Sequence, residues 1–390
     1  MLRVLIVRGR LVTPWELRPW RELPEAFDVR YLSSRTNAFD TSDVDLRPVP
    51  TRSVRDLLPR GMLGEVAAGV FGDRYLKEAD AAYAQADIVH AEELSFWFSA
   101  DAARRKQRHA YRLVQTVWET LPFLSTYRNR HARAYRKEVL AATDLFLPAT
   151  ERAREALRLE GVAEEKMLVC PPGIDVGRFA VAAGGPSPTE HTILSPGRLV
   201  WDKGHHDVLR AAAALHRGIV TRADGSVTRP RVRIVGSGPE EQRLRAYAQE
   251  LGLGGAVDFG SVPYDEMPRL FATASAMALM SQSSAAAAYH PFDIPRAFWE
   301  EQFGLVLAEA MAAGLAIVTT TNGAIPEVVA GSEAELVAPG DWMELARRLA
   351  AGTLARPPGA RVTHDPALVR RYCTAAAAER LAAAYARVLA

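Results

Sequence analysis

The fold is organised around one stretch of sequence, EQFGLVLAEAMAAG at residues 301–314. The pair Phe303-Gly304 indicates a helix start, and Gly314 indicates the helix end, because glycine favours the conformation that closes a helix. Every residue between the two glycines except Glu309 is apolar, which predicts a helix that is covered on most sides. A buried carboxylate needs partners. Glu309 is therefore either bonded to protein groups or ready to accept a hydrogen bond from a ligand hydroxyl.

A second carboxylate, Glu301, lies just before this helix. The free N–H groups and the positive dipole end of a helix N-terminus attract phosphate. A phosphate bound there would have one carboxylate on each side, and both carboxylates can accept hydrogen bonds from hydroxyl groups. This arrangement would fit a nucleotide sugar.

Two glutamates separated by seven residues, with a Phe-Gly pair between them and Ala-Met-Ala at 310–312, resemble the signature of family 4 retaining glycosyltransferases of the GT-B fold. The resemblance implies an α/β protein with two Rossmann-like, doubly wound domains that face each other across a cleft. It implies that Glu301 contacts the hydroxyls of the transferred sugar and that Glu309 contacts the ribose. The backbone at Gly304 and Leu305 would bind the phosphate.

The segment PGRLVWDKG at residues 196–204 follows an apolar run and carries Arg198 and Lys203 five residues apart. Two cations at a strand end and a helix start can hold a diphosphate from two sides. The resemblance assigns this catalytic role to Arg198 and Lys203, which would neutralise the charge of the departing diphosphate. The alternative is a surface turn with two cations.

Two further turns of the second half resemble family turns near the donor. Gly236-Ser237-Gly238-Pro239 follows an apolar strand, but Pro239 and the lack of a third glycine argue against a dinucleotide fingerprint. By resemblance, Gly236 and Gly238 lie near the donor, and the turn at Val262 holds the base through backbone contacts.

Apolar runs alternate with helical patterns along both halves, which predicts parallel, doubly wound sheets. We expect an acceptor-binding domain at residues 1–178 and a nucleotide-sugar-binding domain at residues 190–373. By resemblance, the helix at 374–390 crosses back to the first domain. The expected strands are 2–7, 27–32, 87–90, 111–117, 144–147, 167–170, 192–195, 231–235, 257–259, 277–280 and 315–319. The expected helices include 15–26, 73–86, 95–109, 127–141, 151–160, 240–251 and 341–352, and residues 33–62 are expected to be loop.

Two residues of the first half are candidates at strand ends. Relatives place a Gly-Gly loop after the first strand, against the donor phosphates, whereas this chain has only Gly9 there. Relatives often have a histidine beside the transferred sugar where this chain has Trp118-Glu119. Glu119 either takes its place, stabilising positive charge or contacting the acceptor, or caps the following segment.

Two basic clusters lie in the first half, Arg104, Arg105, Lys106, Arg108 and Arg112, and then Arg128, Arg130, Arg133, Arg136 and Lys137. They are either solvated helix faces or a surface for an anionic or lipid-linked acceptor or the membrane. Nucleic acid is not expected as a partner, because no nucleic-acid motif accompanies them.

Composition sets broad limits. The net charge of the 390 residues is +2, and the two cysteines are too few for a disulfide framework or a cysteine-based zinc site. No apolar run reaches the length of a membrane-spanning helix. We expect a cytoplasmic protein with no cofactor and no metal. If the basic clusters bind lipid, it would be peripheral at the inner face of the membrane.

Two alternatives stay open. One is an epimerase or hydrolase of the same fold, which would lack an acceptor site, and another is a non-catalytic partner that binds nucleotide sugars. A glycosidase is disfavoured, because the spacing and context of the two glutamates do not indicate the paired acid and nucleophile of hydrolysis.

The segment at 281–300 is longer than in most family members, and is either a lid or a tolerated loop.

Overall fold

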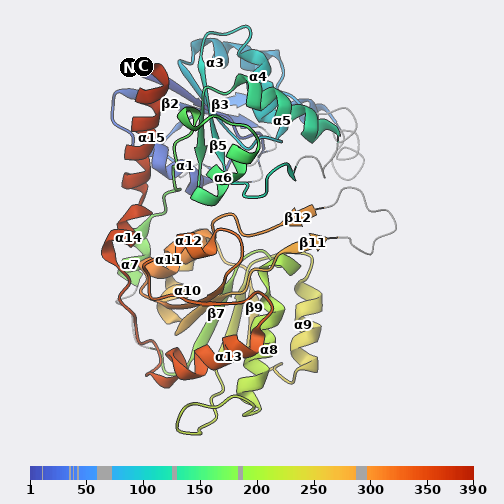
Figure 1. The fold of residues 1–390 in the computed structure, drawn as a ribbon, viewed down its shortest axis with the longest axis vertical. Coiled ribbons are helices and arrows are strands. Elements are labelled where there is room, and N and C mark those ends of the chain that lie inside the picture. Colours follow the sequence, from blue (N-terminus) through green and yellow to red (C-terminus); the bar gives the residue numbers. More distant parts are fainter. Residues whose placement is uncertain are drawn as a thin grey trace. The chain divides into compact units, whose positions relative to one another are not determined.

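The computed structural model describes residues 1–10, 12–34, 37, 39–41, 44–58, 73–124, 130–182, 188–286 and 297–390. The chain divides into two compact units, each with its own six-stranded sheet (Figure 1). Unit 1 comprises Met1–Ile174, Ala286–Phe298 and Cys373–Ala390, and unit 2 comprises Asp175–Ala285 and Trp299–Tyr372. The acceptor-binding and donor-binding roles expected of the two halves stay predictions.

The strands of the unit 1 sheet are all parallel and follow the order β3-β2-β1-β4-β5-β6. They are β1 (Leu2–Ile6), β2 (Phe27–Ser34), β3 (Arg47–Thr51), β4 (Ile88–Glu92), β5 (Arg112–Val117) and β6 (Leu145–Pro148). The chain builds outward from β1 to β3 and then returns to the other side of β1. The winding therefore reverses between β1 and β4.

Helices cover both faces of this sheet. They are α1 (Pro14–Arg21), α3 (Asp80–Gln85), α4 (Trp97–Arg105), α5 (Arg130–Ala142), α6 (Glu151–Leu159) and α15 (Thr374–Leu389), with short 3-10 turns η1 (Val54–Leu57), η2 (Lys77–Ala79) and η4 (Glu164–Lys166). Successive side chains of a strand point to opposite faces. Leu5 and Val7 therefore join an apolar cluster with α3, α4 and α5, whereas Val4 and Ile6 join another with α1 and α15.

The C-terminal helix is fixed to unit 1 by a buried tyrosine. The Tyr385 hydroxyl accepts a hydrogen bond from Nε1 of Trp20 at 2.7 Å and lies 2.6 Å from Nδ1 of His90. Burial lowers the pKa of His90 to about 3, so the imidazole is neutral and can accept at Nδ1.

The strands of the unit 2 sheet are also parallel, in the order β14-β13-β10-β7-β8-β9. They are β7 (Thr192–Pro196), β8 (Arg231–Val235), β9 (Val257–Gly260), β10 (Ala276–Leu279), β13 (Ala316–Thr320) and β14 (Glu335–Val337). Here the winding reverses between β7 and β10. The predicted α/β architecture of two Rossmann-like, doubly wound sheets is confirmed.

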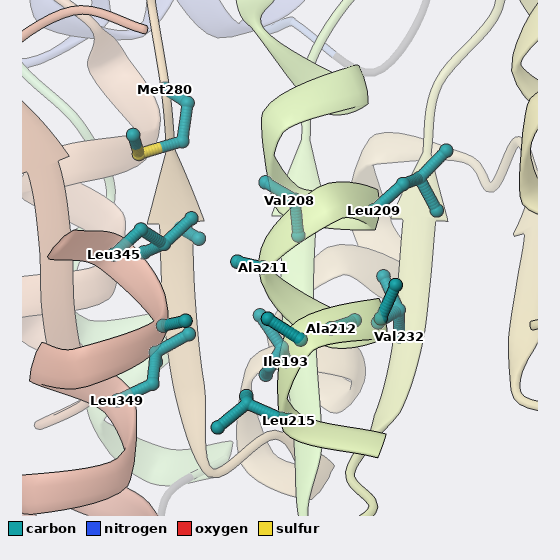
Figure 2. Packing of buried hydrophobic residues seen from close by; sticks show 14 of the residues in the cluster. Ile193, Val208, Leu209, Ala211, Ala212, Leu215, Val232, Met280, Leu345 and Leu349 are labelled. Carbon is teal, nitrogen blue, oxygen red and sulfur yellow. The ribbon is translucent and has the colours of Figure 1, made fainter. Parts of the chain in front are cut away.

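The helices of unit 2 pack on a core that is rich in alanine and leucine. They are α7 (Val176–Ala182), α8 (His205–His216), α9 (Glu241–Glu250), α10 (Met267–Thr273), α11 (Leu305–Ala312), α12 (Ile325–Val328), α13 (Trp342–Ala351) and α14 (Pro366–Arg371), with 3-10 turns η5 (Trp201–Lys203), η6 (Tyr264–Glu266) and η7 (Thr353–Ala355). Figure 2 shows Val208 and Leu215 of α8 in one cluster with Ile193 of β7 and Leu345 of α13. This packing fixes α8 on the sheet, directly after the loop that carries Lys203.

Three predictions about local structure are wrong. The expected loop at 33–62 contains β3, a proline-bearing edge strand that pairs only with β2. The expected strand at 167–170 is reduced to an isolated bridge between Met167 and Phe146. The expected helix at 73–86 begins only at η2 and α3.

The segment at 281–300 contributes a separate two-stranded sheet, β11 (Ser284–Ala286) with β12 (Ala297–Trp299). Residues 287–296 of this segment and Arg128 of the second basic cluster lie outside the described residues.

Candidate functional site

The candidate site lies where the winding of unit 2 reverses. The loop after β7 carries Arg198 and Lys203, and the chain that follows β10 leads through β11 and β12 to Glu301 and the start of α11. In open α/β sheets, ligands bind beyond the carboxyl ends of the strands at such a reversal. Arg198, Lys203 and Glu301 therefore come from the elements that flank this position.

Lys203 and Glu301 form a close ion pair although they are 98 residues apart in the sequence. Nζ of Lys203 lies 2.6 Å from Oε2 and 2.9 Å from Oε1 of Glu301. The side chains are only 14% and 6% exposed, respectively. The Ser281 hydroxyl donates a third hydrogen bond to Oε2, at 2.6 Å. The carboxylate is thus fully oriented and points at the lysine.

The backbone of Glu301 is held by the turn after β13. The Glu301 N–H donates to Oδ1 of Asn322 at 2.6 Å, and the Ala324 N–H donates to the Glu301 carbonyl at 2.8 Å. A Cβ added to Gly323 would lie 2.1 Å from that carbonyl oxygen. Glycine at this position therefore lets the turn close on Glu301.

Arg198 differs from Lys203 in its surroundings. Its side chain is exposed, and none of the residues that the structure describes forms a hydrogen bond or ion pair with its guanidinium. Buried His205 fixes the turn that carries Arg198. Its Nε2 lies 3.1 Å from the Arg198 carbonyl oxygen, and its Nδ1 lies 2.8 Å from the Ser195 hydroxyl. Burial lowers the pKa of His205 to about 4. A neutral imidazole that donates at Nε2 and accepts at Nδ1 satisfies both contacts.

The predicted glycines Gly236 and Gly238 lie against the turn of Arg198. A Cβ on Gly236 would lie 1.9 Å from the Gly197 carbonyl oxygen, and a Cβ on Gly238 would lie 2.4 Å from the Leu199 carbonyl oxygen. Both glycines also have positive φ angles. Their immediate structural role is close packing of two backbones, which no other residue type permits.

Helix α11 begins as the sequence predicts. Gly304 precedes it with φ 76°, in the left-handed region, and Leu305 is its first residue. The N–H groups of the first turn of a helix have no partner within the helix. Leu307, Ala308 and Ala310 are buried, so the prediction of a covered helix is confirmed.

Glu309 is buried within α11, with 3% of the residue exposed. The Tyr264 hydroxyl donates a hydrogen bond to its Oε1 at 2.9 Å. Among the described residues this is its one hydrogen bond, so the bonding capacity of the carboxylate is largely unused. Burial raises the pKa of Glu309 to about 7, against the opposing effects of Tyr264 and of the Arg178 charge. Val262, also predicted for this region, is half-buried in the turn that precedes Tyr264.

Two predicted residues lie in unit 1. The Gly9 N–H donates to the Tyr75 hydroxyl at 2.9 Å, and a Cβ on Gly9 would lie 2.7 Å from the Phe98 ring. Glu119 accepts hydrogen bonds from the backbone N–H groups of Thr120 and Leu121 at 3.1 and 3.0 Å. Glu119 thus caps the segment that follows it, which is one of its two expected roles.

The sequence reasoning missed a buried ion-pair group where the winding of unit 1 reverses. Arg8, just after β1, lies 2.5 Å from Glu92 at the end of β4 and 3.1 Å from Glu16. Burial raises the pKa of Glu92 to about 7. The signal available in the sequence was a charged residue close to the carboxyl end of each of two predicted strands.

Across the described ranges, no group of three or more His, Cys, Asp or Glu residues is arranged to hold a metal ion. Metal independence stays a prediction.

Comparisons with known proteins cover nearly the whole chain. A family model described as Glycosyltransferase Family 4 matches residues 21–178, and a model described as Glycosyl transferases group 1 matches residues 180–352. The boundary between the two matches falls close to the start of unit 2.

Curated relatives match over part of their length. A GDP-mannose-dependent alpha-(1-6)-phosphatidylinositol monomannoside mannosyltransferase of Mycobacterium tuberculosis is 28% identical over 57% of this chain and 54% of its own length. A glycogen synthase of the same organism is 27% identical over 74% of this chain and 63% of its own length. The chain thus spans less than two thirds of either relative.

Solved structures match over the full length. Anabaena HepE in complex with UDP and glucose aligns with a TM-score of 0.72 at 18% identity, covering 99% of this chain and 100% of that one. Sucrose-phosphate synthase from Thermosynechococcus elongatus aligns with a TM-score of 0.64 at 18% identity, covering 100% of this chain and 97% of that one. The fold is therefore that of the GT-B glycosyltransferases. Together with the two family matches, this places the chain in family 4 of the glycosyltransferases, and the predicted resemblance is confirmed.

Proposed function

We propose that this protein is a retaining glycosyltransferase that moves a hexose-type sugar from a nucleoside diphosphate sugar to an acceptor hydroxyl without a metal ion. One observation carries the proposal: the buried Lys203–Glu301 pair lies where the winding of unit 2 reverses, beside the exposed Arg198. A cation for phosphate and a carboxylate for sugar hydroxyls are there in direct contact. A nucleotide sugar presents both of these chemical groups at adjacent positions.

Each residue of the site has one role in this proposal. Arg198 and Lys203 bind the diphosphate, and the first N–H groups of α11, at Gly304 and Leu305, bind the same anion from the helix end. The anomeric C–O bond breaks toward the diphosphate, so negative charge develops on oxygens that these donors already face. Stabilisation of that charge by fixed donors is the main catalytic contribution.

The two carboxylates select the rest of the donor. Glu301 accepts hydrogen bonds from the sugar hydroxyls once Lys203 has moved toward the phosphate, and Glu309 accepts from the ribose hydroxyls. Glu309 has unused capacity in a buried position, which supports this role. Gly236, Gly238 and Val262 shape the surface for the nucleoside. The roles expected of Glu119 at the sugar or acceptor and of Gly9 at the phosphates, both in unit 1, stay predictions.

The donor class is supported by similar proteins. A structural neighbour was solved with UDP and glucose and again with UDP-glucose. A curated relative is named as GDP-mannose-dependent. These names support a nucleoside diphosphate hexose for this chain and leave two bases to be tested.

The acceptor is proposed to be anionic or lipid-linked and to meet unit 1 at α5. In the first basic cluster, Arg104 pairs with Glu138 and Lys106 with Asp144, both at 2.5 Å. On α5, Arg130, Arg133 and Lys137 are all exposed along one side of the helix. Such a side suits an anionic acceptor or the inner face of a membrane. No helix of the described residues is long and apolar enough to cross a membrane.

The proposal is tested by a donor panel without metal. Thermal unfolding is measured with UDP, GDP, ADP and dTDP and their common sugars, in the presence of a chelator. One nucleotide should stabilise the wild type, and Arg198→Ala should lose that stabilisation. Arg243→Ala is the matched control, because Arg243 is exposed on α9 and, among the described residues, forms an ion pair only with Glu240.

The selected donor is then offered to candidate acceptors, and the anomeric configuration of the product is read by NMR. Transfer with retained configuration supports the proposal. Donor hydrolysis or epimerisation without transfer to any acceptor would favour the alternative enzymes of the same fold. Absence of a shift with every nucleotide at millimolar concentration would refute the donor site.

A further inference from the structure

An aromatic ring lies beside the lysine of the proposed diphosphate site. Nζ of Lys203 is 4.7 Å from the centre of the Trp299 ring, while the same atom pairs with Glu301 at 2.6 Å. Trp299 is half-buried, and it is the last residue of β12. The ammonium group thus has two different partners, a carboxylate and the face of an indole ring.

These two partners behave differently when a donor binds. If Glu301 turns to the sugar hydroxyls, as proposed above, Lys203 loses its counter-ion at the moment when it must face the phosphate. The ring has no net charge, and sugar hydroxyls do not compete for it as they do for a carboxylate. It can therefore keep its contact with Lys203. A cation over an indole face is attracted by the ring quadrupole, and the attraction grows when water is removed. A bound donor would cover the site and remove water from it.

We propose that Trp299 is a positioning residue that holds Lys203 for the diphosphate after Glu301 has been engaged by the sugar. The inference rests on the proposed function and deepens it. It also gives the described part of the segment at 281–300 a role, because β12 places the indole two residues before Glu301. The sequence left this segment as either a lid or a tolerated loop, and the contact with Lys203 adds a third role.

The proposal predicts a dependence on the ligand. Trp299→Leu keeps apolar bulk and removes the ring. The variant should bind UDP-glucose or GDP-mannose, whichever the wild type accepts, about 3-fold to 10-fold more weakly. Its affinity for the corresponding bare UDP or GDP should fall less, because Glu301 can still share Lys203 when no sugar is present. Trp299→Phe should lie between the wild type and the leucine variant, because a phenyl ring attracts cations more weakly than an indole.

A neighbouring tryptophan supplies the matched control. Trp201 is 53% exposed, belongs to the same loop as Lys203, and stacks on His206 at a centroid distance of 3.9 Å. Trp201→Leu removes an indole near the site without removing the contact to the lysine. The affinity of the Trp201→Leu variant for both ligands should change by less than about 2-fold. Such a result would show that the loss in Trp299→Leu comes from the contact with Lys203 and not from removing any indole near the site.

Calorimetry on a double-mutant cycle separates the outcomes. Lys203→Met alone should weaken both ligands, and adding Trp299→Leu to it should change neither affinity further. If Lys203→Met leaves binding unchanged, the proposed diphosphate site itself fails. If Lys203→Met weakens binding but Trp299→Leu has an equal effect with and without the lysine, the ring acts on the ligand directly, and the positioning role is refuted. An unchanged affinity in Trp299→Leu, with unchanged thermal unfolding, refutes it as well.

Discussion

Replacing Glu301 by glutamine should strengthen the binding of a bare nucleoside diphosphate, although the same change should slow sugar transfer. Lys203 is neutralised by Glu301 at 2.6 Å, and both side chains are largely buried. A diphosphate without a sugar must compete with this carboxylate for the lysine and must also approach its negative charge. Glutamine removes both obstacles and keeps the shape of the side chain.

The magnitude follows from the geometry of the pair. Two unit charges 4 Å apart interact by about 4 kcal/mol at an effective dielectric constant of about 20. The glutamine oxygen still accepts from Lys203, and the Trp299 ring still faces it, so only part of this energy is released. We expect a gain of about 1 to 3 kcal/mol in binding, which is roughly 5-fold to 150-fold in affinity. The empty variant should be less stable than the wild type, because one partner of a buried pair has been removed.

Calorimetric titration with UDP and GDP and parallel thermal unfolding measure both effects. The melting temperature of the empty variant should fall, and the shift on adding the nucleotide should exceed that of the wild type. Glu344→Gln is the matched control, because it removes a carboxylate from an exposed ion pair with Arg348 on α13. The competition between Glu301 and the ligand would be refuted if Glu301→Gln bound the diphosphate no more tightly than the wild type, while Glu344→Gln bound it as the wild type does.

Three further changes test the surrounding structure. Burial raises the pKa of Glu309 to about 7 from an ordinary 4.5, so its contribution to stability is fully present below pH 4.5 and is lost as the pH rises through 7. Urea unfolding of Glu309→Gln should therefore show a larger gain over the wild type at pH 8 than at pH 5, and an equal difference at both pH values would contradict the cause. Gly236→Ala should destabilise the protein by at least about 2 kcal/mol in the same assay, whereas Gly255→Ala, where a Cβ meets nothing within 4 Å, should stay near the wild type. His205→Leu leaves the Arg198 carbonyl without its buried donor and should cost about 1 to 3 kcal/mol of stability as well as nucleotide affinity; unchanged affinity would mean that the turn of Arg198 holds its position without the imidazole.

Much of the fold follows from the sequence because buried parallel strands are continuous apolar runs. The strand β8 (Arg231–Val235) has the bounds expected from its sequence, and the alanine-rich segment at the end of the chain forms α15 (Thr374–Leu389). The strand β3 could not be predicted in this way, since RPVPT carries two prolines and forms an edge that pairs with one neighbour only. A local sequence pattern does not predict a strand that forms through pairing with its neighbour rather than through burial of its own apolar side chains.

In the candidate site, too, some features could be predicted from the sequence and others could not. The motif around Glu301 and the cations Arg198 and Lys203 could be read from residue type and spacing. The direct pairing of Lys203 with Glu301 could not, because it depends on which loops meet at the reversal of the sheet. Trp299 gave no signal of its own, since an isolated tryptophan in a long loop is compatible with many positions.

The most direct test of the central claim is a structure of the protein with the nucleotide sugar that it binds. The account predicts that the diphosphate lies within hydrogen-bonding distance of Arg198, Lys203 and the Leu305 N–H. It also predicts that Lys203 has left Glu301 and that the Glu301 carboxylate accepts from sugar hydroxyls. A nucleotide bound elsewhere, or a Lys203–Glu301 pair that is intact beside a bound donor, would contradict it.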